Sequence, residues 1–134
     1  MAQVLLVVLL LLQPQATDQH WYIQFVKLVG VAIGVWAIIT MGRFFNISPR
    51  VRDNAPLRTK GPYRFVRHPM HLALLIFCGA FVLGDFAIYT FALWLALLLV
   101  LGIKVHYEEK ILRSRFPDYS KYAESTKRII PLIF

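Results

Sequence analysis

Two short polar stretches contain the residues best suited to chemistry, and an apolar region separates them. The first, residues 61–72, reads GPYRFVRHPMHL and includes Arg67 and His68. The second reads KVHYEEK and includes the adjacent carboxylates Glu108 and Glu109. A cationic helix start can bind a carboxylate, and glutamates accept hydrogen bonds from hydroxyls or an amine. Together the two stretches suit a zwitterionic ligand with a carboxylate at one end and a sugar diol at the other.

Each stretch also has a simpler structural explanation. Arginines beside an apolar segment can serve only to anchor it at a membrane surface, and Pro69 is typical of a first helical turn. Glu108 lies four residues after Lys104, so the two can form an ion pair on a solvated helix end. Tyr119 and Tyr122 can stack on an adenine or anchor the chain at a membrane interface. The residue types alone leave these alternatives open.

The segments that must position these residues are apolar. The chain has 134 residues, is 58% hydrophobic and 16% charged, and has a mean hydropathy of +0.59. A soluble domain usually carries about 25% charged residues. The composition therefore predicts a single-domain integral membrane protein. The net charge is +8, and the basic residues lie between apolar segments. This position favours anionic lipid headgroups or an anionic cofactor as partners over nucleic acid.

The apolar segments predict an all-α membrane bundle of about four membrane helices. The first segment is short and predicts a partial membrane helix, with a cleaved signal-like segment as the alternative. The second is long enough to span, and its Gly30 and Gly34 form a GxxxG pattern that permits close helix packing. Along the chain we expect N-terminal membrane helices (1–45), a cytosolic loop (46–68) and a tight helical hairpin (69–103) turning at Gly84 and Asp85. The cytosolic C-terminal segment (104–134) should leave the bilayer as an amphipathic helix and then lie near its surface.

Positive charge predicts the orientation of this bundle. Of the 15 Lys and Arg residues, 14 lie in residues 43–68 or 104–134. Such residues mark the cytoplasmic side. Both polar stretches should therefore meet at the cytoplasmic face, with the hairpin crossing out and back. The lack of a nuclear or organelle signal favours a bacterial inner membrane.

The spacing of cysteine and histidine predicts neither a disulfide nor a metal site. The single cysteine, Cys78, lies inside an apolar run and fits a small packing residue. The four histidines show no zinc-ligand pattern such as HExxH; they are His20, His68, His71 and His106.

The order and spacing of the two polar stretches resemble a known family. The chain reads G-x-Y-R-x-x-R-H-P, then an apolar hairpin, then E-E-x-x-L-x-x-x-F-x-x-Y-x-x-Y. This resembles the superfamily of isoprenylcysteine carboxyl methyltransferases and phospholipid methyltransferases, over about residues 40–134. Two positions depart from the family pattern, which often has Tyr at His71 and Arg at Lys104. The N-terminal part is also short compared with larger relatives.

The resemblance implies an S-adenosylmethionine-dependent enzyme with a cytosolic cofactor pocket formed by the C-terminal half. His68 and the backbone near Met70 would hold the methionine end of the cofactor, and the two glutamates its ribose or amino group. The tyrosines and the Ile129–Ile130 stretch would enclose it. The residues assigned to the cofactor are Tyr63, His68, Met70, Leu72, Glu108, Glu109, Tyr119 and Tyr122. The catalytic residues would be Arg67, which orients the acceptor, and Glu108.

The resemblance favours O-methylation of an isoprenylcysteine-like carboxylate on a lipophilic or lipid-modified acceptor. A carboxylate acceptor needs positioning but no base. The alternative is N-methylation of a phosphatidylethanolamine-type phospholipid, for which Glu108, Glu109 or His106 is a candidate base. Two alternatives belong to other classes. One is an NADPH-dependent enzyme similar to sterol reductases, and the other is a non-catalytic adaptor that binds anionic lipid.

Overall fold

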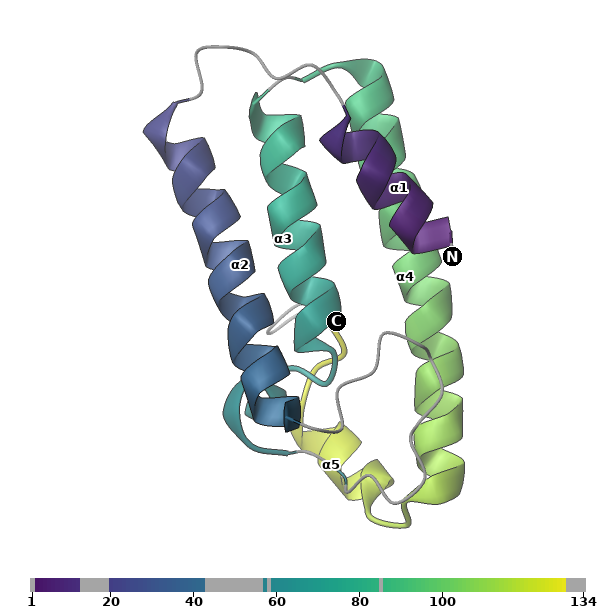
Figure 1. Ribbon diagram of the computed structural model, residues 1–134. Coiled ribbons are helices and arrows are strands. Elements are labelled where there is room, and N and C mark those ends of the chain that lie inside the picture. Colours follow the sequence, from purple (N-terminus) through teal and green to yellow (C-terminus); the bar gives the residue numbers. More distant parts are fainter. Residues whose placement is uncertain (1, 13–19, 43–56, 58, 85, 130–134) are drawn as a thin grey trace.

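The fold is helical throughout the part of the chain that the structure describes. This computed structural model describes residues 2–12, 20–42, 57, 59–84 and 86–129, and contains no strand within them. The expectation of an all-α fold is confirmed. The elements are α1 (Ala2–Leu11), α2 (Trp21–Met41), the 3₁₀ turn η2 (Gly61–Arg64), α3 (Pro69–Gly84), α4 (Ile88–Arg115) and α5 (Tyr119–Ser125) (Figure 1).

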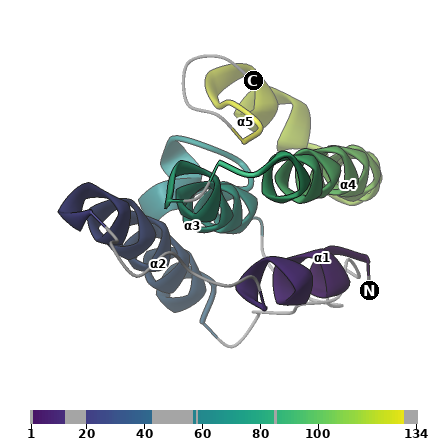
Figure 2. The same ribbon diagram turned by 90° about the horizontal axis from the view of Figure 1, so that it is seen from above.

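Helix α3 lies between α2 and α4, and α1 packs against α4 with a smaller contact to α3 (Figure 2). Two of these helices, α2 and α4, are long and apolar enough to cross a membrane. Helices α1 and α3 are apolar but shorter. With 16 residues, α3 is about 24 Å long, less than the about 30 Å of a hydrocarbon core. The prediction of about four membrane helices therefore reduces here to two candidate spans and two shorter helices.

The GxxxG pattern lies at the contact between α2 and α3, as the sequence predicts. A Cβ atom at Gly30 would come within 2.9 Å of the Phe77 backbone nitrogen and 3.0 Å of the Ala73 carbonyl oxygen. At Gly34 a Cβ would lie 3.5 Å from the Ala73 Cβ, an ordinary contact. Gly30 is thus the residue that lets the two backbones approach closely.

The core lies mainly between α3 and α4, with α1 closing one side. Its buried residues are Leu10, Leu75, Cys78, Leu97, Leu101, Val105 and Ile129. Cys78 is 1% exposed, which fits the packing role expected of it. Trp94 on α4 donates a hydrogen bond from Nε1 to the Leu75 carbonyl oxygen at 3.1 Å. This bond joins the two helices of the predicted hairpin.

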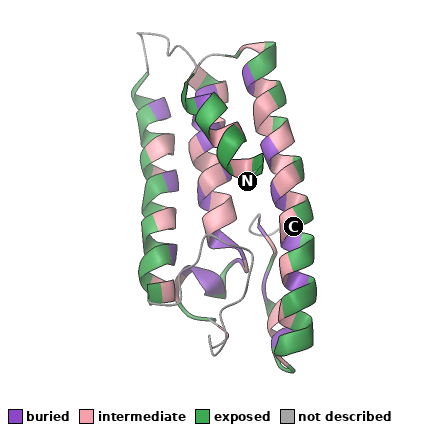
Figure 3. Cartoon of the chain, turned by 45° about the vertical axis from the view of Figure 1, so that its right-hand side comes forward, coloured by how far each residue is buried: buried purple, intermediate pink, exposed green. Residues whose placement is uncertain are grey.

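Large apolar side chains cover the outer side of α2. Exposed residues run along the whole helix (Figure 3), among them Phe25, Leu28 and Ile39. A soluble monomer rarely exposes so continuous an apolar surface. Contact with lipid acyl chains accounts for it.

Helix α4 extends beyond the apolar hairpin segment that ends near Ile103, as expected of a chain that leaves the bilayer as a helix. It continues without a break to Arg115, over 28 residues. No proline or glycine follows Gly102 until Pro117, and the residues between are mostly good helix formers. At about 42 Å, α4 exceeds the hydrocarbon thickness, so that its charged last turns can extend beyond a bilayer.

The two polar stretches lie at the same end of the bundle. The end of α2, the start of α3, the last turns of α4 and α5 are all found there (Figure 1). This agrees with the expectation that the two stretches lie beside each other; the number of membrane passes between them stays a prediction. Most of the predicted cytosolic loop, Asp85 of the predicted turn, and Ile130 lie outside the described residues.

Candidate active site

The loop before α3 is fixed by a glycine and two prolines. Gly61 has φ of +61°, and a Cβ there would come within 2.7 Å of the Thr40 Oγ1 atom on α2. Only glycine avoids both the backbone strain and the clash. Pro62 then begins η2, and Pro69 begins α3. Between these two prolines the chain places Arg67 and His68 at the entrance to the bundle.

His68 lies between the two adjacent carboxylates of α4. Its Nδ1 atom is 3.4 Å from Glu108 Oε2, and its Nε2 atom is 3.7 Å from Glu109 Oε1. Burial lowers the pKa of His68, but hydrogen bonding to Glu108 and the negative charges of Glu108 and Glu109 raise it by more, so that it lies above its ordinary value. The predicted convergence of the two polar stretches is therefore present in the structure.

Lys104 completes the surroundings of Glu108. Its Nζ atom lies 3.7 Å from Glu108 Oε1, so the predicted i,i+4 pair is confirmed. The same Nζ donates a hydrogen bond to Gln3 Oε1 at 3.0 Å. Helix α1 thus reaches the site through its first turn. Gln3 has no distinguishing sequence context, so sequence analysis could not assign it to this site.

Glu109 forms a second and more deeply buried ion-pair cluster. Arg67 Nε lies 2.7 Å from Glu109 Oε1, and Arg128 Nε lies 3.2 Å from Glu109 Oε2. The Nη1 atom of Arg67 donates to the carbonyl oxygens of Ala123, at 2.6 Å, and Thr126. Arg67 therefore joins the start of α3 to α4 and to the C-terminal end of α5.

The residues after α5 run beside the loop that precedes α3. Val66 and Lys127 form an isolated parallel bridge. The backbone nitrogens of Arg67 and His68 donate to the carbonyl oxygens of Lys127 and Arg128, at 2.7 and 2.9 Å. This pairing holds the two functional side chains in register. It uses backbone groups, which leave no signal in the residue types.

The three predicted tyrosines are connected through Tyr122. Tyr122 donates its hydroxyl hydrogen to the Tyr63 carbonyl oxygen at 2.6 Å, and the Tyr119 and Tyr122 rings lie 5.9 Å apart. Burial, together with the charge of Glu108, raises the pKa of Tyr63 to about 12, and burial raises that of Tyr122 to about 12. Both hydroxyls therefore stay protonated at neutral pH and can donate hydrogen bonds.

The other predicted residues lie farther from the carboxylates of α4. Met70 and Leu72 are half-buried in the first turn of α3, and the Leu72 side chain packs against the hydrophobic core. Ile129 is also part of that core. His106, an alternative base, is exposed and contacts the Tyr107 ring instead of the carboxylates.

Several buried polar atoms at this site have no hydrogen-bond partner among the described residues. They are His68 Nε2, His71 Nδ1 and Tyr119 Oη. Native interiors rarely leave such atoms unpaired because their desolvation is costly. A ligand with donors and acceptors would pair them, and a cofactor with ammonium, carboxylate and hydroxyl groups has both kinds. The residues present therefore fit a polar cofactor.

Apolar helices with a buried ionic cluster at one end define a class: a helical membrane protein with a polar site at one end of its helix bundle. Within that class the chain belongs to the isoprenylcysteine carboxyl methyltransferase family, whose sequence model matches residues 22–114. The match includes α2, which the motif resemblance leaves out, and ends before α5. The sequence-based recognition of the family is confirmed.

Individual relatives agree with this assignment. Two rice proteins (Oryza sativa subsp. indica and subsp. japonica), both named probable protein-S-isoprenylcysteine O-methyltransferase, are 34% identical over 123 residues. Protein-S-isoprenylcysteine O-methyltransferase A of Arabidopsis thaliana is 30% identical. These matches cover 86% of this chain but only 64% of each rice protein and 62% of the Arabidopsis protein.

A bacterial relative has a different kind of name. The cobalt-zinc-cadmium resistance protein CzcN of Cupriavidus metallidurans is 30% identical over 116 residues, covering 85% of this chain and 53% of that protein. No solved structure shows a significant match to the chain.

Proposed function

We propose that this chain is an S-adenosylmethionine-dependent methyltransferase that O-methylates the carboxylate of an isoprenylcysteine-like, lipophilic acceptor. The observation that carries the proposal is the position of His68 between Glu108 and Glu109, at the end of the apolar bundle. Family membership supports methyl transfer, and the names of the plant relatives support the acceptor. The chain spans less than two thirds of those relatives, so the activity of the whole protein is part of the proposal.

The cofactor site would combine the start of α3 with the last turns of α4 and with α5. His68 would bind the methionine carboxylate, and Glu108 the ammonium or a ribose hydroxyl. Tyr63, Tyr119 and Tyr122 would enclose the adenosine part. When bound, the cofactor supplies an activated methyl group. The work of the protein is then to align acceptor and donor and to exclude water.

Arg67 is the proposed orienting residue for a carboxylate acceptor. Its Nε and Nη1 atoms are bonded to Glu109, Ala123 and Thr126. Contact with an acceptor would therefore fall to Nη2. The bonds to the protein hold the guanidinium plane fixed, which would reduce the entropy lost on binding the acceptor.

N-methylation of an amine lipid is the second candidate function. The engagement of Arg67 within the protein favours it, because an amine acceptor needs no arginine. Such an acceptor must lose a proton, and Glu108, whose side chain is 17% exposed, is the accessible carboxylate beside His68.

The proposed location follows from the arrangement of the helices. Both polar stretches would face the cytoplasm in a multi-pass bundle, in our proposal within a bacterial inner membrane. A lipophilic acceptor would enter from the bilayer between the helices, while the cofactor would arrive from water. A site at the membrane boundary is where the two can meet.

The test is methyl transfer in membranes that contain the protein. Labelled S-adenosylmethionine would be supplied with an S-prenylated cysteine that has a free carboxylate, or with phosphatidylethanolamine. The proposal predicts a base-labile methyl ester on the first acceptor, and loss of that product in Glu108→Gln but not in Glu124→Gln, an exposed carboxylate on α5. A base-stable N-methyl product would favour the second candidate. Failure to methylate either acceptor, in folded protein, would contradict both.

A further inference from the structure

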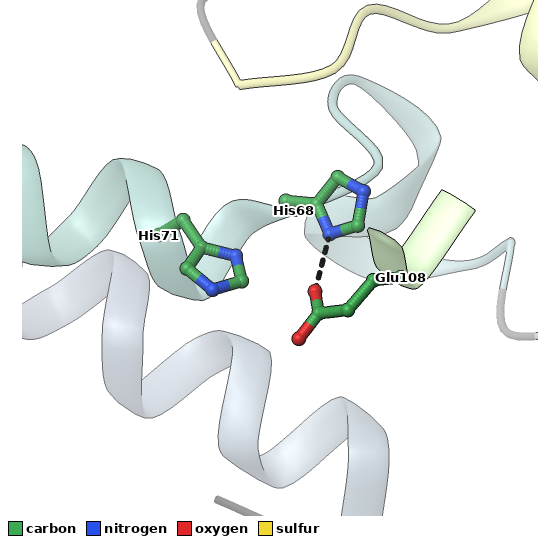
Figure 4. Close-up of side chains that lie close together, drawn as sticks. All are labelled: His68, His71 and Glu108. Atoms are coloured by element: carbon green, nitrogen blue, oxygen red, sulfur yellow. Dashed lines mark ion pairs between the residues drawn. The ribbon is translucent and has the colours of Figure 1, made fainter. Parts of the chain in front are cut away.

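Three potential metal ligands converge at the start of α3. His68, His71 and Glu108 each offer one ligand atom, and these atoms all lie within 4.8 Å of one another. Figure 4 shows both imidazoles on the α3 side and the carboxylate of Glu108 on α4 facing them. The sequence spacing gave no sign of this cluster because the third ligand comes from a different helix.

The chemistry of the side chains suits a borderline cation. Two imidazole nitrogens and one carboxylate oxygen form a common ligand set for Zn²⁺, and three protein ligands leave a fourth position open. His68 and His71 are three residues apart at the helix start, so their side chains lie on one side of α3. His71 has a buried Nδ1 atom without a hydrogen-bond partner among the described residues. His68 turns its Nδ1 atom toward Glu108, while its Nε2 atom lies on the side of Glu109.

The distances between the three ligand atoms are close to those around a tetrahedral zinc ion. Ligand atoms bound at 2.0–2.1 Å around a tetrahedral zinc lie about 3.4 Å apart. His68 Nδ1 and Glu108 Oε2 are already 3.4 Å apart. The two imidazole rings have centroids 5.5 Å apart and are tilted by 56°. The ligand atom of His71 lies within 4.8 Å of the other two, so each separation would have to shorten by about 1.4 Å or less.

The neighbouring charges allow a cation to bind. Glu109 adds a second carboxylate next to His68, and its charge is shared with Arg67 and Arg128. Lys104 opposes a cation because it lies 3.7 Å from Glu108 Oε1. Its second partner, Gln3, can retain it when Glu108 turns to a metal.

We propose that His68, His71 and Glu108 form a binding site for Zn²⁺ or a similar divalent transition metal. A metal and the methyl donor would then exclude each other, since His68 and Glu108 are also proposed cofactor ligands. This second part rests on the proposed function, whereas the metal site itself does not. The position of His71 often holds Tyr in the family, so the site would be a property of this chain and not of the family.

The first experiment measures metal binding without any cofactor. Zn²⁺ is titrated calorimetrically into the purified, detergent-solubilised protein, and Co²⁺ is titrated while its visible absorption is recorded. We expect one Zn²⁺ per chain and the intense visible bands of tetrahedral Co²⁺. In His71→Tyr the affinity should fall by at least about tenfold and the bands should be lost.

Two further variants make the result specific. His20→Ala removes an exposed imidazole outside the site and should leave the affinity and the bands unchanged. Glu108→Gln should weaken binding as His71→Tyr does, and circular dichroism would confirm that each variant is folded. Equal Zn²⁺ affinity in wild type and His71→Tyr, or equal loss in His20→Ala, would overturn the site.

A competition experiment tests the second part separately. S-Adenosylhomocysteine binding is measured with and without saturating Zn²⁺, in wild type and in His71→Tyr. We expect Zn²⁺ to weaken nucleoside binding in wild type only. If Zn²⁺ binds but S-adenosylhomocysteine does not, the proposed function fails while the metal site stands. If both bind without interference, the mutual exclusion is wrong.

Discussion

At the scale of single residues, Glu109 is the centre of the site's electrostatics. Its side chain is 4% exposed and lies next to Arg67, Arg128 and His68. A buried carboxylate is costly unless cationic partners compensate for its desolvation, and here each oxygen has at least one. We interpret Glu109 as mainly a structural carboxylate, and the more exposed Glu108 as the one available to ligands.

Removing the charge of Glu109 should therefore destabilise the fold. In Glu109→Gln the buried guanidinium of Arg67 loses its counterion, and we expect a loss of about 3 kcal/mol in the free energy of unfolding. The measurement is thermal unfolding of detergent-solubilised protein. The exposed carboxylate of Glu124 gives the matched control, and Glu124→Gln should change stability by less than about 0.5 kcal/mol. Equal stability of the two variants would show that the buried pair contributes nothing.

Arg67 depends on the shape of its guanidinium as well as on its charge. Arg67→Lys keeps the charge but cannot contact Glu109, Ala123 and Thr126 together, because an ammonium lacks the planar fork. We expect α5 to detach more readily, measured as faster amide hydrogen exchange in Tyr119–Ser125. The exposed Arg64 provides the comparison, and Arg64→Lys should leave that exchange unchanged. Unchanged exchange in Arg67→Lys would contradict the clamping role.

At this scale the sequence predicted the partners but not the way they are held. Arg67, His68, Glu108 and Glu109 could be brought together from the order of the segments and the charge pattern. The two carbonyl oxygens that bind Arg67 could not be predicted, because every residue has a backbone carbonyl group. Whether Arg67 contacts the acceptor stays a prediction.

At the scale of helices, the close contact of α2 with α3 depends on Gly30. In Gly30→Ala the new methyl would approach the α3 backbone within about 3 Å, and we expect a loss of about 1–3 kcal/mol from overpacking. Thermal unfolding of three glycine variants would test this. Gly34→Ala has room for an ordinary contact, and Gly102→Ala has nothing within 4 Å, so both should be tolerated. A Gly30→Ala variant as stable as these two would contradict the packing.

The helices show where sequence patterns are informative. The turn between α3 and α4 was predicted near Gly84, because a break in a long apolar run is visible in the sequence. The helical continuation of α4 beyond Lys104 was also predicted, because the polar residues that follow it keep an amphipathic pattern; its end at Arg115 was not assigned. The packing of α1 against α4 had no signal, since apolar residues cover every side of α1 after Gln3.

At the scale of the whole molecule, the proposed site requires the two polar stretches to lie on one side of the membrane. The single cysteine makes a direct test possible, because Cys78 can be replaced by Ala. In that background, Glu124→Cys on α5 and Phe86→Cys between α3 and α4 place one thiol at each end of the bundle. A membrane-impermeant thiol reagent should label the first only from the cytoplasmic side and the second only from the opposite side. Labelling of both from one side would contradict a spanning hairpin.

The central claim is that the site formed by His68 and Glu108 binds the methyl donor, and calorimetric binding of S-adenosylhomocysteine to solubilised protein tests it most directly. We predict saturable binding by wild type and Glu124→Gln, and at least about tenfold weaker binding by Glu108→Gln, because a charge-assisted hydrogen bond is lost. NADPH should not bind. The absence of S-adenosylhomocysteine binding in folded wild-type protein, or equal affinity in Glu108→Gln, would contradict the account.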